Sequence, residues 1–254
     1  MPLIETEGIV LKSYNLAEAD RIVVLLTQDH GVVRGVAKGA KRLKSRFGSG
    51  LEPFSEVRVE YFQKDNIELV SLQRIDLVRS NFEVASSPEF LQKFSYLSDI
   101  VVSLLPPHDP NEKAYRMVRA CIAAAASDAA SLQAIGVYFE LWMLRLAGFL
   151  PDWSRCQNCG RGFDADEEVN VQANFHLLCS NCRRAASSRT IDGQGRALLT
   201  DVTRLAPGKF AASAREDTER LRSLSRILKD IIAQAVGREL SGEISLSPPA
   251  ANNG

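Results

Sequence analysis

Two pairs of cysteines carry the clearest chemistry in this chain of 254 residues. Cys156 and Cys159 form one C-x-x-C pair, and Cys179 and Cys182 form a second pair after nineteen intervening residues. Two residues between thiolates allow a tight turn that points both sulfurs at one ion, and two such turns joined by a hairpin complete a tetrahedron. Four thiolates fill the coordination of zinc and leave no position for water or substrate. The spacing therefore predicts a structural Zn²⁺ site.

Other uses of these cysteines are less favoured. Disulfides are rare in the cytosol, and a rubredoxin-like iron site would need the same four ligands. His176 lies three residues before Cys179, but four cysteines already suffice, so we expect it to be a hairpin side chain. The fifth cysteine, Cys121, is surrounded on a predicted helix by Met117, Val118 and Ile122, which is typical of a small core residue.

A second candidate site is the basic run KGAKRLKSRFGSG, residues 38–50. It contains five cations and no acidic residue, although the whole chain has 31 basic and 31 acidic residues. Cations on a glycine-rich loop can follow phosphates without reading bases, whereas an ordinary charge run is only a solvated face. Phe47, inside the run, either stacks on a base or anchors the loop. The candidate phosphate-binding residues are Arg34, Lys38, Lys41, Arg42, Lys44 and Arg46.

The elements around the basic run read as strands over the first eighty residues. Apolar and alternating stretches separated by turn signals predict five strands, in TEGIVLKSY, RIVVLLT, VVRGVAK, FSEVRVEYF and IELVSLQRIDL. Five strands suit a small closed barrel, which removes exposed edges, and such barrels often bind oligonucleotides. The basic run falls between the third and fourth strands and is therefore predicted to be a loop on the barrel.

After residue 80 the apolar period becomes helical. Ser87 is a predicted helix cap and Pro88 the first helical residue. Further helices are predicted in DPNEKAYRMVRACIAAAAS, in SLQAIGVYFELWMLRLAG and over residues 221–235. The fold class is thus α+β. We expect a barrel domain at 1–80, a helical domain at 81–245 with the zinc module at about 153–185, and a disordered tail at 246–254.

Enzyme signatures are absent from the sequence. There is no Walker loop, no G-x-S-x-G and no H-E-x-x-H, and the carboxylate cluster DADEEV is expected to be a solvated hairpin tip. We therefore expect a protein that is not an enzyme. No apolar run has the length of a membrane span, and the N-terminal residues do not resemble a secretory signal, so cytoplasm is the expected location.

In three blocks the sequence resembles the bacterial RecO family of DNA repair and recombination mediators. The blocks are GVAKGAK, then LEPF, then YFELWMLRLAGFLPDWSRCQNCG, in this order. The resemblance covers most of residues 5–185. Where family members often have a Gly-Gly pair before the second C-x-x-C, this chain has ANFHLLC.

The resemblance implies an N-terminal OB-fold, a helical C-terminal domain and a four-cysteine zinc module. It implies binding of single- and double-stranded DNA, annealing of complementary strands and loading of RecA onto strands coated by single-strand binding protein. RecR and the acidic C-terminal tail of single-strand binding protein are the implied partners, and the implied location is the bacterial cytoplasm, at the nucleoid during repair. Cys156, Cys159, Cys179 and Cys182 are the implied zinc ligands, and the six cations named above the implied DNA-binding residues.

Two other functions fit the same pattern. One is an RNA-binding translation or ribosome-assembly factor with a barrel and a zinc module, which would prefer structured RNA to single-stranded DNA. The other is a zinc-dependent hydrolase, which would need three protein ligands and an exchangeable water at the metal.

Overall fold

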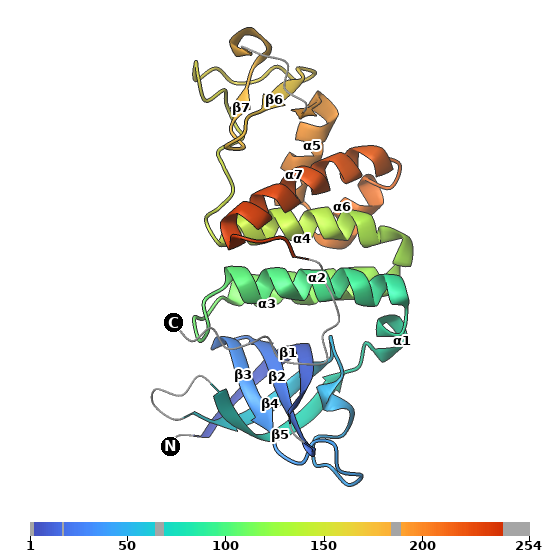
Figure 1. Ribbon diagram of the computed structural model, residues 1–254. Helices are drawn as coiled ribbons and strands as arrows, with labels where there is room; N and C mark the ends of the chain where they lie inside the picture. The colour runs from blue at the N-terminus through green and yellow to red at the C-terminus, as the bar shows by residue number, and fades with distance from the viewer. Residues whose placement is uncertain (1–2, 17, 64–68, 184–188, 241–254) are drawn as a thin grey trace. The chain divides into compact units, whose positions relative to one another are not determined.

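The computed structural model describes residues 3–16, 18–63, 69–183 and 189–240 (Figure 1). They form two compact units: the first contains the residues up to Ala126 together with Leu240, and the second runs from Ser127 to Glu239. Within the described ranges, no helix combines the length and the apolar character that crossing a bilayer requires. The predicted tail at 246–254 lies outside the described residues.

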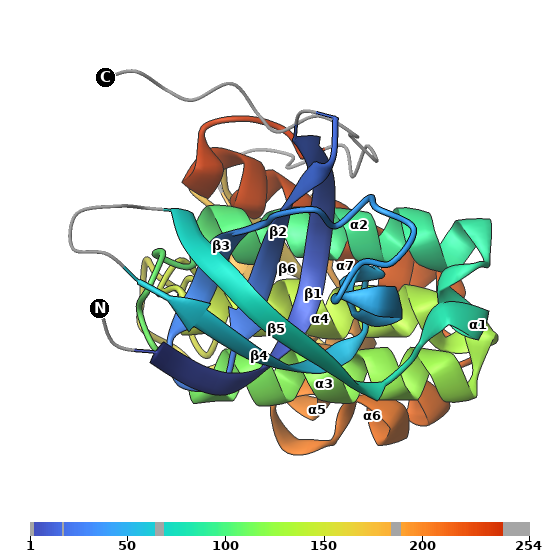
Figure 2. The ribbon, with the colours of Figure 1, turned by 90° about the horizontal axis from the view of Figure 1, so that it is seen from below.

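The first unit is built on a closed five-stranded barrel (Figure 2). Its strands are β1 (Leu3–Leu16), β2 (Asp20–Thr27), β3 (Gly31–Ala37), β4 (Glu56–Phe62) and β5 (Leu69–Arg79). The order around the barrel is β1-β2-β3-β5-β4, and the closing pair of β3 and β5 is parallel while the other pairs are antiparallel. This is the OB-fold, which confirms the predicted barrel. Strand β1 is long enough to pair with both β2 and β4, and its pairing with β2 shifts register between Val10 and Lys12.

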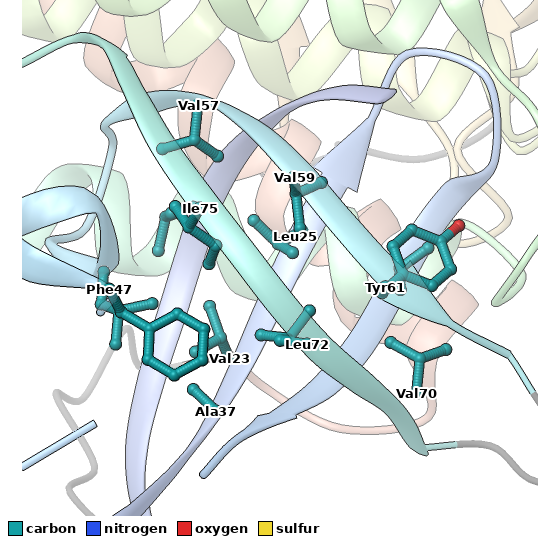
Figure 3. Packing of buried hydrophobic residues seen from close by; sticks show 13 residues of the cluster. Val23, Leu25, Ala37, Phe47, Val57, Val59, Tyr61, Val70, Leu72 and Ile75 are labelled. Carbon is teal, nitrogen blue, oxygen red and sulfur yellow. The ribbon is translucent and has the colours of Figure 1, made fainter. Parts of the chain in front are cut away.

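Alternation along the strands produces two buried layers. Val23 and Leu25 belong to the cluster inside the barrel (Figure 3). Their neighbours Val24 and Leu26 point to the outer side, because successive side chains of a strand face opposite ways, yet both are also buried. The outer side of the barrel is therefore covered in part, and helix α2 (Pro88–Leu104) contacts β1.

Aromatic packing joins α2 to the barrel. Phe54, in the LEPF block, adopts a positive φ of 67°, and its ring meets Phe90 and Phe94 of α2 edge-on at 5.7 and 5.6 Å between centroids. Lys12 of β1 also bonds Asp99 of α2 at 2.5 Å. The first unit thus continues past the last barrel strand to include α1 (Phe82–Ala85), α2 and α3 (Glu112–Ser127).

The predicted start of α2 is confirmed. The Ser87 side chain accepts a hydrogen bond from the Phe90 N–H, and Pro88 is the first helical residue. The helices predicted over residues 109–127, 131–148 and 221–235 are present as α3, which begins only at Glu112, α4 (Leu132–Leu146) and α7 (Thr218–Val236). Cys121 is completely buried on α3, as expected of a core residue.

The second unit packs α4 mainly against α7, with α5 (Gly193–Arg204) and α6 (Pro207–Ser213) beside α4. Trp142 of α4 donates its ring N–H to the Val202 carbonyl at 3.0 Å, and the Tyr138 hydroxyl donates to the Leu205 carbonyl at 3.1 Å. A small sheet with the order β7-β6-β8 interrupts the helices. Its strands are β6 (Val169–Val171), β7 (Leu177–Leu178) and β8 (Thr190–Ile191). The described residues also contain three short 3₁₀ turns: η1 (Gly48–Leu51), η2 (Ala129–Ser131) and η3 (Ser180–Cys182).

Candidate nucleic-acid interface and candidate metal centre

The basic run lies between β3 and β4, as predicted, and we call residues 38–51 the basic loop. In Figure 1 it extends from the end of the barrel away from α2 and α3. Its beginning is fixed by backbone hydrogen bonds: the Gly39 N–H donates to the Asp20 carboxylate at 2.7 Å, and the Lys41 N–H donates to the Ala19 carbonyl at 2.9 Å. Gly39 has a φ of 72°, a value that an L side chain rarely adopts.

The far end of the basic loop is fixed by burial. Phe47 is only 2% exposed and lies in the barrel cluster near Val23 and Ala37 (Figure 3). A Cβ on Gly50 would stand 2.6 Å from a methyl carbon of Ile75, so only glycine permits this close approach. Of the two roles open to Phe47, the structure therefore shows the anchor and not a base-stacking platform.

The loop cations are all exposed, but they are not equivalent. Arg46 lies back on the barrel, where its guanidinium covers the Phe47 ring at 5.0 Å and donates to the Leu72 carbonyl at 3.3 Å. Lys38, Lys41, Arg42 and Lys44 precede this anchor, and no acidic residue interrupts the loop. The fixed ends thus present a concentrated positive charge to solvent, an arrangement that suits contact with phosphates.

Arg34 occupies a different position. It is half-buried on β3, where it pairs with Val24 and Leu69. The pKa of Tyr14 is raised, first by burial and then by the charge of Asp99, while the Arg34 guanidinium acts in the opposite direction. Arg34 therefore stands near Tyr14 on the barrel wall, and the structure brings together only the five loop cations.

The second candidate site gathers all four predicted ligands. The sulfurs of Cys156, Cys159, Cys179 and Cys182 lie within 4.8 Å of one another. Cys159 Sγ and Cys179 Sγ are 3.9 Å apart, and in a tetrahedron with Zn–S bonds of about 2.3 Å the sulfurs stand about 3.8 Å apart. All five cysteines of the chain are free of disulfides. The cluster can hold one metal ion, and its donor set is that of a closed structural site.

The backbone holds each cysteine pair in a turn. The Gly160 N–H donates to the Cys156 carbonyl at 2.8 Å, with Gly160 at a φ of 73°, and the Cys182 N–H donates to the Cys179 carbonyl at 3.0 Å. The two turns meet because the Gln157 N–H, inside the first turn, donates to the Leu177 carbonyl of β7 at 3.0 Å. This is the two-turn arrangement that the spacing predicts.

The pKa values of the cysteines diverge because their sulfurs lie close together. Burial raises the pKa of Cys156, but N–H groups of Cys179, Cys159 and Asn158 outweigh burial and lower that pKa to about 6. The Asn158 amide lowers the pKa of Cys182, but the neighbouring Cys179 and Cys159 prevail and raise it to about 11. Negative charges on sulfurs this close repel one another, and a bound cation offsets that repulsion.

One carboxylate of the DADEEV cluster has a role that the sequence did not suggest. Glu167 is 8% exposed at its side chain and accepts from Arg161 at 2.7 Å and from the Ser180 N–H at 3.0 Å. The Arg161 hydrogen bond, followed by that of Ser180, lowers the pKa of Glu167 to about 2. Arg161 also acts on Cys179: burial raises the pKa of that thiol, but Cys182 and then Arg161 outweigh burial and lower it. The predicted solvated tip is thus wrong for Glu167, which is bonded to Arg161 and Ser180 beside the cysteine cluster, although Asp164 is exposed as expected.

The β6–β7 hairpin forms without the Gly-Gly pair. Phe175 takes a φ of 61° at the turn, a conformation that favours glycine. Three contacts hold the residue there: its N–H donates to the Gln172 carbonyl at 2.9 Å, its carbonyl accepts from the Trp153 ring N–H at 2.8 Å, and Arg189 lies over its ring at 5.9 Å. These three contacts stabilise a backbone conformation that glycine would adopt without strain.

Comparison with known proteins identifies the family. A sequence profile described as Recombination protein O N terminal matches residues 1–81, and a second, described as Recombination protein O C terminal, matches residues 93–242. The chain belongs to the RecO family. The match to the N-terminal profile ends at residue 81, just after β5, which ends at Arg79. The first compact unit instead continues to Ala126.

Curated relatives agree with this membership. The chain is 34% identical to the DNA repair protein RecO of Koribacter versatilis over 242 residues, which cover 93% of this chain and 95% of that protein. It is 31% identical to the protein of the same name from Geobacter metallireducens over 236 residues, 93% of each chain. The expected family is therefore confirmed, and the membership assigns the chain to DNA repair and recombination. This favours a repair protein over the translation factor and the hydrolase.

Proposed function

We propose that this RecO-family protein is a recombination mediator that binds single- and double-stranded DNA through the basic loop and anneals complementary strands. The observation that carries the proposal is the anchored loop, with five exposed cations on an OB-fold barrel, in a chain that matches the RecO family along nearly its whole length. Phosphate contacts from such a loop bind any base sequence, which is what an annealing protein requires.

The proposed protein partners follow from family membership. They are RecR, the acidic C-terminal tail of single-strand binding protein and, through them, RecA, which is loaded onto the coated strand. We assign the acidic tail to the helical second unit. Exposed cations on that unit support this assignment: Arg204, Lys209, Arg226 and Arg238. The proposed location is the bacterial cytoplasm, at the nucleoid during repair.

The proposed metal is one structural Zn²⁺ held by Cys156, Cys159, Cys179 and Cys182. Four soft thiolates in a tetrahedral arrangement favour zinc over the hard cations that prefer oxygen. Such a site keeps no open position for water or substrate. The proposal is accordingly that the protein acts by binding and not by catalysis.

The direct test is an annealing assay. Complementary strands coated with single-strand binding protein are mixed with the full-length protein, and duplex formation is followed by energy transfer between end labels. We expect annealing to be faster than without the protein, and to be slowed when the cations of the loop are replaced. If annealing with the wild-type protein were no faster than without it, the mediator function would be refuted. If the protein preferred structured RNA to single-stranded DNA in competition, the RNA-binding alternative would be selected.

A further inference from the structure

An exposed leucine stands among the cations of the basic loop. Leu43 lies between Arg42 and Lys44 and its exposed fraction is 101%. The next most exposed large hydrophobic residue in the described ranges is Phe82, at 60%. Single exposed apolar side chains are common on protein surfaces, so the exposure alone assigns no role. The backbone around Leu43 and the charges beside it supply the rest.

The backbone keeps Leu43 in solvent. The Arg42 N–H donates to the Gly39 carbonyl at 3.1 Å, and the Ser45 N–H donates to the Arg42 carbonyl at 2.9 Å, so Leu43 lies inside the second of two consecutive turns. Buried Phe47 closes the loop four residues later. The contrast with the other two large apolar side chains of the loop is informative, because Phe47 and Leu51 are each only 2% exposed while Leu43 is held away from the barrel.

The pattern of cation, leucine and cation matches the chemistry of a base step. A nucleic-acid strand presents charged phosphates on its backbone and apolar base faces between them. Proteins that bind the minor groove of DNA frequently insert a leucine or another apolar side chain between base steps, at an unstacking cost of a few kcal/mol per step. Arg42 and Lys44 flank Leu43, and all three side chains are exposed.

We propose that Leu43 is a wedge that inserts between neighbouring bases and unstacks them while the flanking cations bind phosphates. This inference rests on the proposed function, since it requires the loop to be the DNA interface. It adds a step to annealing: a strand whose stacking is interrupted presents separated bases to its complement. The target is any stacked base step, in a single strand or in a duplex.

The test uses the full-length protein and DNA that carries 2-aminopurine, whose fluorescence rises when it is unstacked. Single-stranded and duplex probes form separate arms. We expect the wild type to raise the fluorescence at saturation in at least one arm, and Leu43→Ala to remove most of that rise. Affinity should fall by up to about tenfold, since the smaller side chain buries less apolar surface, while the salt dependence stays unchanged because no charge is lost.

Two controls separate the wedge from the interface. Leu77→Ala makes the same change at a barrel leucine that is 41% exposed, and it should leave the fluorescence rise intact. The double variant Arg42→Ala, Lys44→Ala should make the salt dependence shallower. A rise that persists in Leu43→Ala, or is absent from the wild type in both arms, overturns the wedge even if the salt dependence of the double variant falls as expected. An unchanged salt dependence in the double variant overturns the loop as the interface.

Discussion

Cys156→Ser tests the metal centre most severely. Cys156 is completely buried and its sulfur is one of the four in the cluster, so a hydroxyl in its place is a poor ligand with no replacement nearby among the described residues. Structural zinc contributes about 10–16 kcal/mol to folding in zinc-finger peptides at pH 7. That is comparable with the whole stability of a domain, about 5–15 kcal/mol. Loss of a large part of this contribution should unfold the segment that carries the cysteines, residues 156–182, which we call the ribbon.

The damage should spread to the helices of the second unit. Arg196 of α5 donates to the carbonyls of Ala165 and Glu167 at 3.0 and 3.1 Å, and Arg189 beside β8 pairs with Asp230 of α7 at 3.0 Å. The barrel should keep its fold, because none of its interior residues comes from the second unit. Hydrogen exchange by mass spectrometry should therefore show rapid exchange over the ribbon and α5, and unchanged protection in β1–β5.

A matched control is available inside the chain. Cys121→Ser makes the same change at a buried cysteine outside the cluster, where it should cost about 1–3 kcal/mol for a buried hydroxyl and leave the metal content unchanged. Elemental analysis should find one zinc per wild-type chain and less than one in Cys156→Ser. If freshly purified, reduced wild type contained no metal, or if Cys156→Ser kept its zinc and its protection, the metal-centre account would be wrong.

Three further predictions concern other parts of the molecule. Glu167→Gln should weaken metal affinity by about 10–100-fold in competition with a chelator, because it loses its charged contact with Arg161, whereas exposed Asp164→Asn should not; equal affinities would contradict this. A fragment of residues 1–126 should be monomeric in sedimentation. A fragment of residues 1–80 should aggregate, because it lacks α2 and exposes the outer apolar side chains of the barrel. If the shorter fragment were stable and monomeric, the packing of α2 on the barrel would be refuted as the reason for their burial. Phe47→Ala should destabilise the barrel by about 3–5 kcal/mol in denaturant unfolding, and a loss of DNA affinity without a loss of stability would restore its stacking role.

The sequence predicted the features that depend on local pattern. The C-x-x-C spacing predicted that the four sulfurs would lie together, because tight turns fix where neighbouring sulfurs point. Ser87 and Pro88 identified the start of α2, because capping depends on adjacent residues only. The five strands were recognisable from alternation and turn signals, and the barrel followed from their number.

What the sequence could not predict depends on contacts between distant segments. Glu167 looks like its acidic neighbours until folding places Arg161 and Ser180 beside it. Phe47 could have stacked on a base or anchored the loop, and only the closed barrel shows that its side chain lies in the barrel interior. Helix α6 was not predicted individually, since it spans only seven residues. Helix α5 was also missed, although its Asp192 cap, which accepts a hydrogen bond from the Gly195 N–H, is a local signal that could have located its start. The aromatic packing of Phe54 on α2 extends the first unit past the barrel, a feature with no local signature.

The DNA interface is the central claim, and the salt dependence of DNA binding tests it most directly. The decisive variant replaces four cations of the basic loop by alanine and keeps Arg46, whose contacts with Phe47 and Leu72 stabilise the barrel. The four are Lys38, Lys41, Arg42 and Lys44. Each phosphate contact contributes about −0.7 to the slope of log affinity against log salt on single strands, so four contacts contribute about −2.8.

A charge-matched control removes four exposed cations from the second unit instead: Arg204, Lys209, Arg226 and Arg238. It changes the net charge equally without touching the loop. We predict that the loop variant binds single strands more weakly, for every base sequence alike, with a slope shallower by up to about 2.8, and that the control keeps the wild-type slope. A folded loop variant with unchanged affinity and unchanged slope would show that the basic loop is not where DNA binds.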